Sequence, residues 1–306
     1  MDFLILLLGI ICAAIGGELF VRGVVGIALW ARISSGIIAA TFAAFATSSP
    51  ELSVSVTSAL AGTPQIALGD ALGSNVVNIA LILGIALLIA PLKTPKDVLK
   101  RDFPVALLVP ILLIILAQDG LLSRADGLIL LSLFAIWVVI MVLEVRRQRS
   151  VAPAILGDNK HGRSVIESLI GLAFLVGSGK LIVSGATAIS AYYGIDPFLV
   201  GATLVAMGTS APELATVVIS RLRGHDEVGL GTILGSNIFN GLFVVAIAAI
   251  INPIAVKWGD VSTGLIFGLI TSICLFPLSA GLIERRRGAL LLALYAVYIS
   301  VLLQRM

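Results

Sequence analysis

Long apolar segments separated by short polar connections account for almost the whole chain. A helix needs about 20 mostly apolar residues to cross the hydrocarbon core of a bilayer. Counted in this way, the pattern predicts ten membrane-spanning helices, at residues 2–29, 36–60, 66–90, 103–118, 125–144, 164–192, 198–221, 227–251, 261–280 and 288–304. One longer polar stretch, 145–163, separates the fifth span from the sixth and has too few apolar residues to form a core.

The chain contains an internal repeat with an offset of 162 residues. Residues 41–51 read TFAAFATSSPE, and residues 203–213 read TLVAMGTSAPE. The two halves, 1–144 and 164–306, carry five predicted spans each and are joined by the linker 145–163. Because five is an odd number, the second half must lie upside down relative to the first, a recurring plan of secondary transporters. The sequence therefore predicts an all-α polytopic membrane protein built from two inverted five-helix repeats.

The composition supports a membrane protein and excludes an ordinary soluble domain. Hydrophobic residues make up 59% of the chain and charged residues 12%, with a mean hydropathy of +1.13. Soluble domains carry about 25% charged residues. The pI of 9.0 would suggest a nucleic-acid partner in a soluble protein, but the basic residues here flank apolar spans, so we expect none. Cys12 and Cys274 lie in apolar segments and indicate neither a disulfide framework nor a zinc motif.

The distribution of lysine and arginine predicts the orientation. Three of these residues lie on one side of the predicted spans, fifteen lie on the other side, and two lie within spans. Cytoplasmic loops of membrane proteins carry the excess of basic residues. We therefore expect an integral protein of the cell membrane with both termini outside and the linker 145–163 in the cytoplasm. The expected partner of the apolar spans is the lipid bilayer, with the monomer as the functional unit.

Prolines inside the second and seventh spans predict that both helices are broken. Pro50 and Pro212 each remove a backbone donor and oppose the preceding helical turn. The break should free carbonyls of that turn, such as those of Ala44 and Ala206, which in lipid must be satisfied by protein, water or an ion. A simple proline kink capped by hydroxyl groups is the alternative. It is less favoured because the whole unit is duplicated and each copy ends in a glutamate, Glu51 in the first.

The third and eighth spans carry a second duplicated motif. Ser74 and Asn78 are four residues apart, and so are Ser236 and Asn240, a spacing that places each pair on one helix face. Each pair can therefore point into the same cavity. The alternative is polar contact between small-residue helix faces, which is common in membranes.

Together the two motifs offer only oxygen ligands. The candidates are the carboxylates of Glu51 and Glu213, the hydroxyls of Thr47, Ser48, Ser74, Thr209, Ser210 and Ser236, the amides of Asn78 and Asn240, and the carbonyls of Ala44 and Ala206. Hard cations prefer such ligands, and calcium takes six to eight of them. Two carboxylates balance one calcium ion, two sodium ions or two protons equally well, which is a physical basis for exchange. No cofactor is expected.

The duplicated Thr-Ser-x-Pro-Glu and Gly-Ser-Asn-x-x-Asn motifs resemble the α-repeats of the calcium/cation antiporter superfamily, in its sodium/calcium exchanger-like branch with prokaryotic members. The resemblance covers essentially the whole chain. It implies sodium-driven calcium exchange by alternating access, with the first and sixth spans sliding past a core bundle. It also implies that the ligands are the twelve residues given above.

The chain departs from this pattern at one important place. Relatives commonly carry an aspartate at one of the positions held here by Asn78 and Asn240. A buried charge should be paired, so two glutamates alone suggest an electroneutral exchange, or protons in place of sodium. Asp70, near the start of the third span, is expected to cap its helix or to serve ion entry. Asn75 and Asn237 lie on another helix face and are expected to bond neighbouring helices.

The sequence leaves three alternative functions open. A proton/calcium exchanger, or an exchanger of another divalent cation, differs only in the ions it couples. A channel is less favoured because inverted repeats around one acidic cage suit alternating access. An intramembrane enzyme is remote, since no histidine lies in a span, Lys180 is the only lysine in one, and no histidine-containing zinc motif is present.

Overall fold

The computed structural model describes residues 2–30, 45, 47–94, 98–147, 161–222, 226–277 and 281–305. The first half of the chain contains α1 (Asp2–Trp30), α4 (Ser49–Leu60), α5 (Pro64–Val76), η2 (Val77–Leu83), α6 (Gly84–Ile89), β1 (Leu92–Lys93), η3 (Val98–Asp102), α7 (Phe103–Leu116), β2 (Leu121–Leu122) and α8 (Arg124–Arg147). The elements labelled η are π-helical turns, and α5, η2 and α6 follow one another without a break.

The second half repeats this order. It contains α9 (His161–Tyr193), α10 (Pro197–Val200), η4 (Gly201–Val205), α11 (Ala206–Thr209), α12 (Ala211–Leu222), α13 (Asp226–Phe239), η5 (Asn240–Val244), α14 (Val245–Ile251), β3 (Ile254–Ala255), α15 (Trp258–Leu275), β4 (Leu282–Ile283) and α16 (Arg285–Leu303). Among the described residues, eight helical segments are long and apolar enough to cross a membrane. The fold is thus a polytopic helical membrane protein, as predicted.

Two predicted spans do not meet that length and composition. α7 has 14 residues, and the five-residue η3 directly precedes it, so the fourth span begins at Val98 rather than 103. The second span is described only from its break onward, as α4, and residues 36–44 lie outside the described part.

The ninth span runs over 258–275, not 261–280, and ends just before Pro277, which cannot continue a helix.

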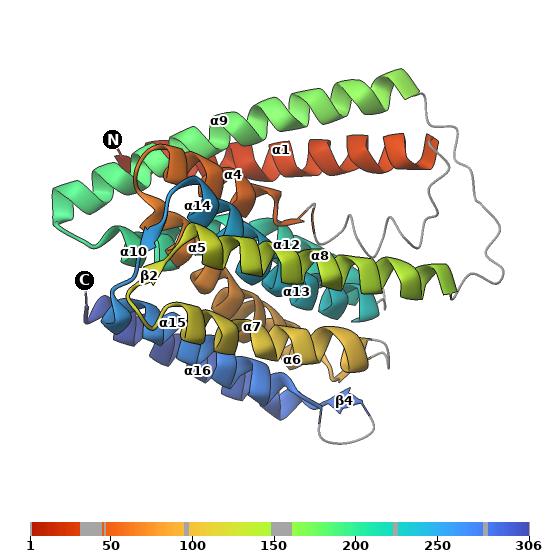
Figure 1. Ribbon diagram of the computed structural model, residues 1–306. Coiled ribbons are helices and arrows are strands. Elements are labelled where there is room, and N and C mark those ends of the chain that lie inside the picture. The colour runs from red at the N-terminus through yellow and green to blue at the C-terminus, as the bar shows by residue number, and fades with distance from the viewer. Residues whose placement is uncertain are drawn as a thin grey trace.

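Two short strand pairs, absent from the sequence prediction, show that the halves are inverted. β1 pairs with β4 and β2 pairs with β3, all antiparallel. The offset of the repeat makes β1 the counterpart of β3 and β2 the counterpart of β4. Figure 1 places β2 and β4 at opposite ends of the molecule. Repeated elements therefore occupy opposite ends, which is the arrangement that an odd number of spans per half requires.

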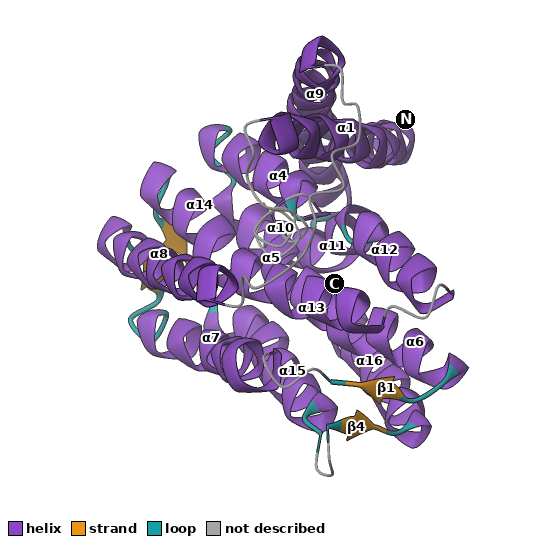
Figure 2. Ribbon diagram, turned by 90° about the vertical axis from the view of Figure 1, so that its right-hand side faces the viewer, coloured by secondary structure: helices purple, strands orange, loops and turns teal. Residues whose placement is uncertain are grey.

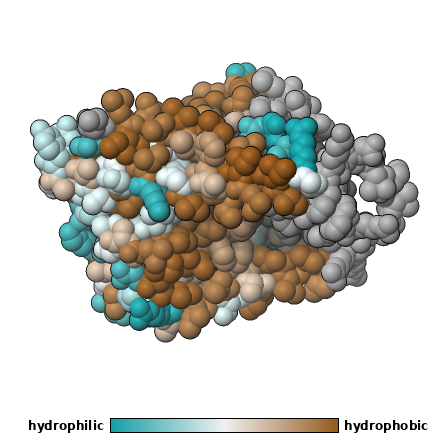
Figure 3. Space-filling model, turned by 90° about the horizontal axis from the view of Figure 1, so that it is seen from above, coloured by the Kyte–Doolittle hydropathy of each residue, from teal (hydrophilic) through white to brown (hydrophobic). Residues whose placement is uncertain are grey.

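Helices α5 and α13 form the centre of the molecule. The spans that contain them are 72% and 83% buried, whereas those of α8 and α16 are 22% buried. Figure 2 shows α5 and α13 surrounded by the other helices, with α1 and α9 paired along one side. The outer surface is largely apolar across the middle and polar toward one end (Figure 3), as expected for a chain surrounded by lipid.

Glycines allow α1 and α9 to lie almost in backbone contact. A Cβ atom at Gly171 would lie 2.3 Å from the backbone nitrogen of Phe20, and one at Gly16 would lie 2.7 Å from Phe174. Small residues at such positions permit close helix packing where lipid offers no hydrophobic driving force. This pair contacts the core bundle through Gly179, whose Cβ would meet the Ser53 hydroxyl at 2.4 Å.

We expect Gly171→Ala to destabilise the protein, because the added methyl group has only backbone to displace. Overpacking of this kind costs about 1–3 kcal/mol. Gly177→Ala on the same helix is the matched control, since no atom of another described element lies within 4 Å of its Cβ position. Thermal unfolding in detergent should show a lower midpoint for Gly171→Ala alone. Equal midpoints for the two variants would contradict the close packing of α1 on α9.

Candidate functional site

Each broken helix turns at a serine in the centre of the molecule. Ser48 has φ −89° and ψ 12°, and Ser210, 162 positions later, has φ −76° and ψ 5°, so both leave the helical conformation. Pro50 then occupies the first turn of α4, where a missing N–H costs nothing. The predicted breaks are therefore present, and both serines are buried.

The expected release of the Ala206 carbonyl is wrong. This carbonyl accepts the backbone N–H of Ser210 at 3.1 Å, an ordinary helical hydrogen bond. The reason is spacing, because Pro212 lacks the N–H that would bond the carbonyl four residues earlier, at position 208. The Ala206 carbonyl also lies 3.5 Å from the Ser74 hydroxyl and 3.4 Å from the Thr209 hydroxyl, both of which are candidate ligands. The corresponding Ala44 lies outside the described residues.

Two hydroxyl pairs join the repeats across the centre. The Thr47 hydroxyl lies 3.1 Å from that of Ser236, and the Ser74 hydroxyl lies 3.4 Å from that of Thr209. The two pairs are related by the 162-residue offset, so each half contributes one residue to each pair. Residues that the sequence placed in separate motifs are thus in contact around a single centre.

The two glutamates are fully buried at this centre but differ in their surroundings. Oε1 of Glu213 accepts hydrogen bonds from Ser48 at 3.4 Å and Ser236 at 3.2 Å. Neither carboxylate oxygen of Glu51 has a hydrogen-bond partner among the described residues, nor has Oε2 of Glu213. In that part of the chain neither glutamate has an ion-pair partner. Buried carboxylates without cationic partners are stable only when a bound cation or proton balances them.

The candidate amides lie where α-helix changes to π-helix. Asn240 begins η5, and Asn78 is the second residue of η2. Such π-helical turns occur frequently at functional sites. Oδ1 of Asn78 and both side-chain polar atoms of Asn240 are buried and have no hydrogen-bond partner in the described structure. The two Oδ1 atoms are free to act as ligands, although an amide carries no charge to balance an ion.

Asn75 and Asn237 hydrogen-bond to each other between α5 and α13, and Asn237 also contacts the candidate ligand Asn78. The side chain of Asn75 donates to the backbone carbonyl of Asn237 at 3.2 Å, and the side chain of Asn237 donates to that of Asn75 at 3.0 Å. Oδ1 of Asn237 also accepts a hydrogen bond from Nδ2 of Asn78 at 3.0 Å. As predicted, Asn75 and Asn237 bond neighbouring helices, and Asn237 in addition orients a candidate ligand.

Asp70 lies in the site, which the sequence prediction did not foresee. Thr63 occupies the N-cap position of α5 and Pro64 begins the helix, so Asp70 is in the second turn and the predicted capping role is wrong. Its side chain is fully buried, and its Oδ1 accepts the Thr209 hydroxyl at 2.9 Å. The signal was present in the sequence, because Asp70, Ser74 and Asn78 recur at intervals of four residues and share one helix face.

Any ion site at this centre needs hydroxyl and amide oxygens as well as carboxylates, because too few acidic side chains converge there. No group of three or more histidine, cysteine, aspartate or glutamate side chains in the described residues converges closely enough to hold a metal ion. The structure brings six candidates from the sequence into contact around this centre, together with the Ala206 carbonyl: Thr47, Ser48, Ser74, Thr209, Glu213 and Ser236. The candidates Glu51, Asn78, Ser210 and Asn240 are buried and lie one to four residues from these along the chain. Their roles as ligands remain a prediction.

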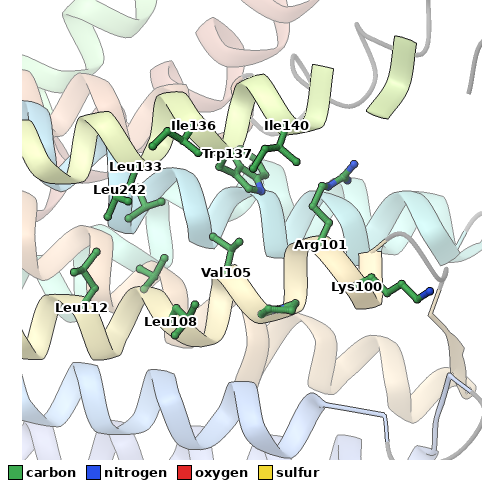
Figure 4. A pocket seen from close by; sticks show the side chains of 12 residues that line it. Lys100, Arg101, Val105, Leu108, Leu112, Leu133, Ile136, Trp137, Ile140 and Leu242 are labelled. Atoms are coloured by element: carbon green, nitrogen blue, oxygen red, sulfur yellow. The ribbon is translucent and has the colours of Figure 1, made fainter. Parts of the chain in front are cut away.

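A separate groove of about 520 Å³ lies between α7 and α8. Figure 4 shows that Leu108, Leu112, Leu133 and Ile136 line it, with Lys100 and Arg101 toward one end. None of the candidate ion ligands lines this groove. Apolar walls cannot replace the hydration shell of a cation, so the groove is not the ion site.

Comparison with known proteins agrees with this geometry. The sequence profile of the family described as sodium/calcium exchanger protein matches residues 1–143 and 164–304. The chain belongs to this family. The Sodium/calcium exchanger MaX1 of Methanosarcina acetivorans is 26% identical over 347 residues, covering 98% of each chain. The Inner membrane protein YrbG of Escherichia coli strain K12 is 35% identical over 226 residues, covering 71% of this chain and 70% of YrbG.

A solved structure of the sodium-calcium exchanger NCX_Mj, soaked with sodium and strontium ions, has the same fold. It superimposes with a TM-score of 0.69 at 31% identity, covering 98% of this chain and 99% of that one. Membership of an exchanger family makes this protein a cation antiporter rather than an enzyme.

Proposed function

We propose that this protein exchanges calcium for sodium across the membrane by alternating access at one central, all-oxygen site. The observation that carries the proposal is the pair of buried glutamates, Glu51 and Glu213, surrounded by hydroxyl and amide oxygens from both inverted halves. Calcium takes six to eight oxygen ligands without sulfur or imidazole. Thr47, Ser48, Ser74, Asn78, Thr209, Ser210, Ser236, Asn240 and the carbonyls of Ala44 and Ala206 are the further proposed ligands. The functional unit is the monomer, and no cofactor takes part.

Alternating access requires one part of the molecule to move past the site. We propose the α1–α9 pair as this part, because it lies along one side of the core bundle (Figure 2) and contacts α4 through Gly179. We also propose that the chain consists of the halves 1–144 and 164–306, joined by the linker 145–163. The family match to residues 1–143 and 164–304 supports this division.

Calcium-45 uptake into proteoliposomes that contain the purified protein tests the proposed function. An outward sodium gradient at constant pH should drive calcium accumulation, and collapsing the gradient with a sodium ionophore should stop it. Uptake that follows a pH gradient and ignores sodium would replace the proposal with proton/calcium exchange. Absence of calcium flux under either gradient would overturn calcium exchange altogether.

The proposed orientation places both termini outside and the linker in the cytoplasm. In a variant that lacks Cys12 and Cys274, we expect Asn159→Cys in the linker to react with an impermeant maleimide only after the cells are lysed. Asp119→Cys, in the exposed turn before β2, should react in intact cells. The opposite labelling pattern would reverse the orientation. The positive-inside rule is the physical reason for the expected result.

A further inference from the structure

Asp70 is a buried charge that the proposed glutamate site leaves unexplained. Its side chain is fully buried on α5. None of the ion pairs within the described residues includes it. Asp102, also an almost fully buried aspartate, instead forms two hydrogen bonds with the guanidinium of Arg101, at 2.7 and 2.9 Å. A charged residue at the centre of a membrane helix costs about 2.5–3.5 kcal/mol on insertion scales, so an unpaired one needs a function.

The surroundings of Asp70 point toward the ion site. Oδ1 accepts the hydroxyl of Thr209 at 2.9 Å and that of Ser74 at 3.4 Å, and both residues are candidate ligands. When these hydroxyls donate to Asp70, their lone pairs are left for a cation. Oδ2 is buried and has no partner in the described structure.

A purely structural role explains these contacts less well. Oδ2 of Asp70 is buried and receives no hydrogen bond from any donor in the part that the structure describes, so no protein group there stabilises its charge. An unmade hydrogen bond of this kind costs about 1–3 kcal/mol. The repeat also shows that the fold does not need a carboxylate here, because the equivalent residue of the second half is the buried Thr232.

We propose that Asp70 supplies a third negative charge to the ion cage. This charge balances one cation in addition to those that Glu51 and Glu213 balance. This inference rests on the proposed function. The three carboxylates do not converge on one ion, so the additional cation occupies its own position beside Thr209 and Ser74.

A count of three carboxylates changes the expected coupling. Two fixed charges match two sodium ions against one calcium ion, an electroneutral cycle. Three fixed charges match three monovalent ions, so exchange against one calcium ion moves one net charge per cycle.

Calcium uptake into proteoliposomes under a potassium–valinomycin voltage tests this assignment. Wild-type uptake should depend on voltage and rise steeply with sodium concentration. Asp70→Asn should lose most of the voltage dependence and lower the Hill coefficient for sodium by about one. Adding Asn240→Asp to this variant should restore both, because it returns the third carboxylate to the same cavity. Asp102→Asn is the control and should keep the wild-type voltage dependence.

The outcomes separate this inference from the proposed function. If Asp70→Asn keeps the wild-type voltage dependence and sodium slope, Asp70 is not the third charge, although calcium exchange stands. Should that variant fail to fold, Asp70→Thr, which copies the second repeat, replaces it under the same criteria. A wild type whose calcium flux is independent of voltage would overturn the third charge as well. A wild type without calcium flux would overturn the proposed function itself.

Discussion

Glu51→Gln and Glu213→Gln are each expected to reduce calcium transport roughly 100-fold or more, since removing one member of a buried charge pair costs about 3–5 kcal/mol. Here the partner is the transported cation. Glutamine keeps the shape of glutamate, and its Oε1 can still accept the Ser48 and Ser236 hydroxyls that bond Glu213. The proteins should therefore still fold, and only the charge is lost.

Sodium-driven calcium-45 uptake, normalised to the amount of folded protein by size-exclusion chromatography, measures this loss. Glu284→Gln is the matched control, because this glutamate lies at the exposed start of α16 and pairs with Arg286. It should transport at the wild-type rate. Normal transport by either Glu51→Gln or Glu213→Gln would show that the ion site has been assigned to the wrong residues.

Most of the fold could be predicted because each span carries its own signal. Apolar runs of sufficient length identify membrane helices locally, and the 162-residue repeat supplies the relation between the halves. The short strand pairs could not be predicted in this way. β1 pairs with β4 across some 190 residues of chain, and such pairing depends on tertiary contact rather than on the sequence of either strand. The π-helical turns at Asn78 and Asn240 likewise left no local signal.

The candidate site also has one part that the sequence predicts and another part that depends on tertiary contacts. The spacing of four residues predicted that Ser74 and Asn78 share a helix face. In the structure, Ser74 lies beside Thr209 and Asn78 lies beside Asn237. The same spacing extends one turn back to Asp70, so its membership of that face was predictable. Its contact with Thr209 was not, because the two residues are 139 positions apart and meet only through the packing of α5 against the second half. The proposal that the ion cage contains a third negative charge rests on this contact between Asp70 and Thr209.

Asn237→Ala is expected to weaken calcium binding about 10–100-fold, the range typical for groups that orient a metal ligand. Asn237 makes three hydrogen bonds. Its side-chain amide donates to the backbone carbonyl of Asn75, and its backbone carbonyl accepts from the side chain of Asn75. Its Oδ1 accepts from Nδ2 of Asn78. The last of these leaves Oδ1 of Asn78 free to act as a ligand. Without it, Asn78 can rotate and turn its amide nitrogen, which repels a cation, toward the site.

The repeat provides the matched control for this effect. Asn75 is the equivalent residue, but the side chain of Asn240 makes no hydrogen bond to it within the described structure. Asn75→Ala therefore loses only the bond to the Asn237 carbonyl and should weaken calcium binding less. The affected quantity should be the calcium concentration for half-maximal uptake, while the maximal rate changes little. Equal losses in the two variants would mean that both asparagines serve only to pack α5 against α13, and that the orientation of Asn78 does not depend on Asn237.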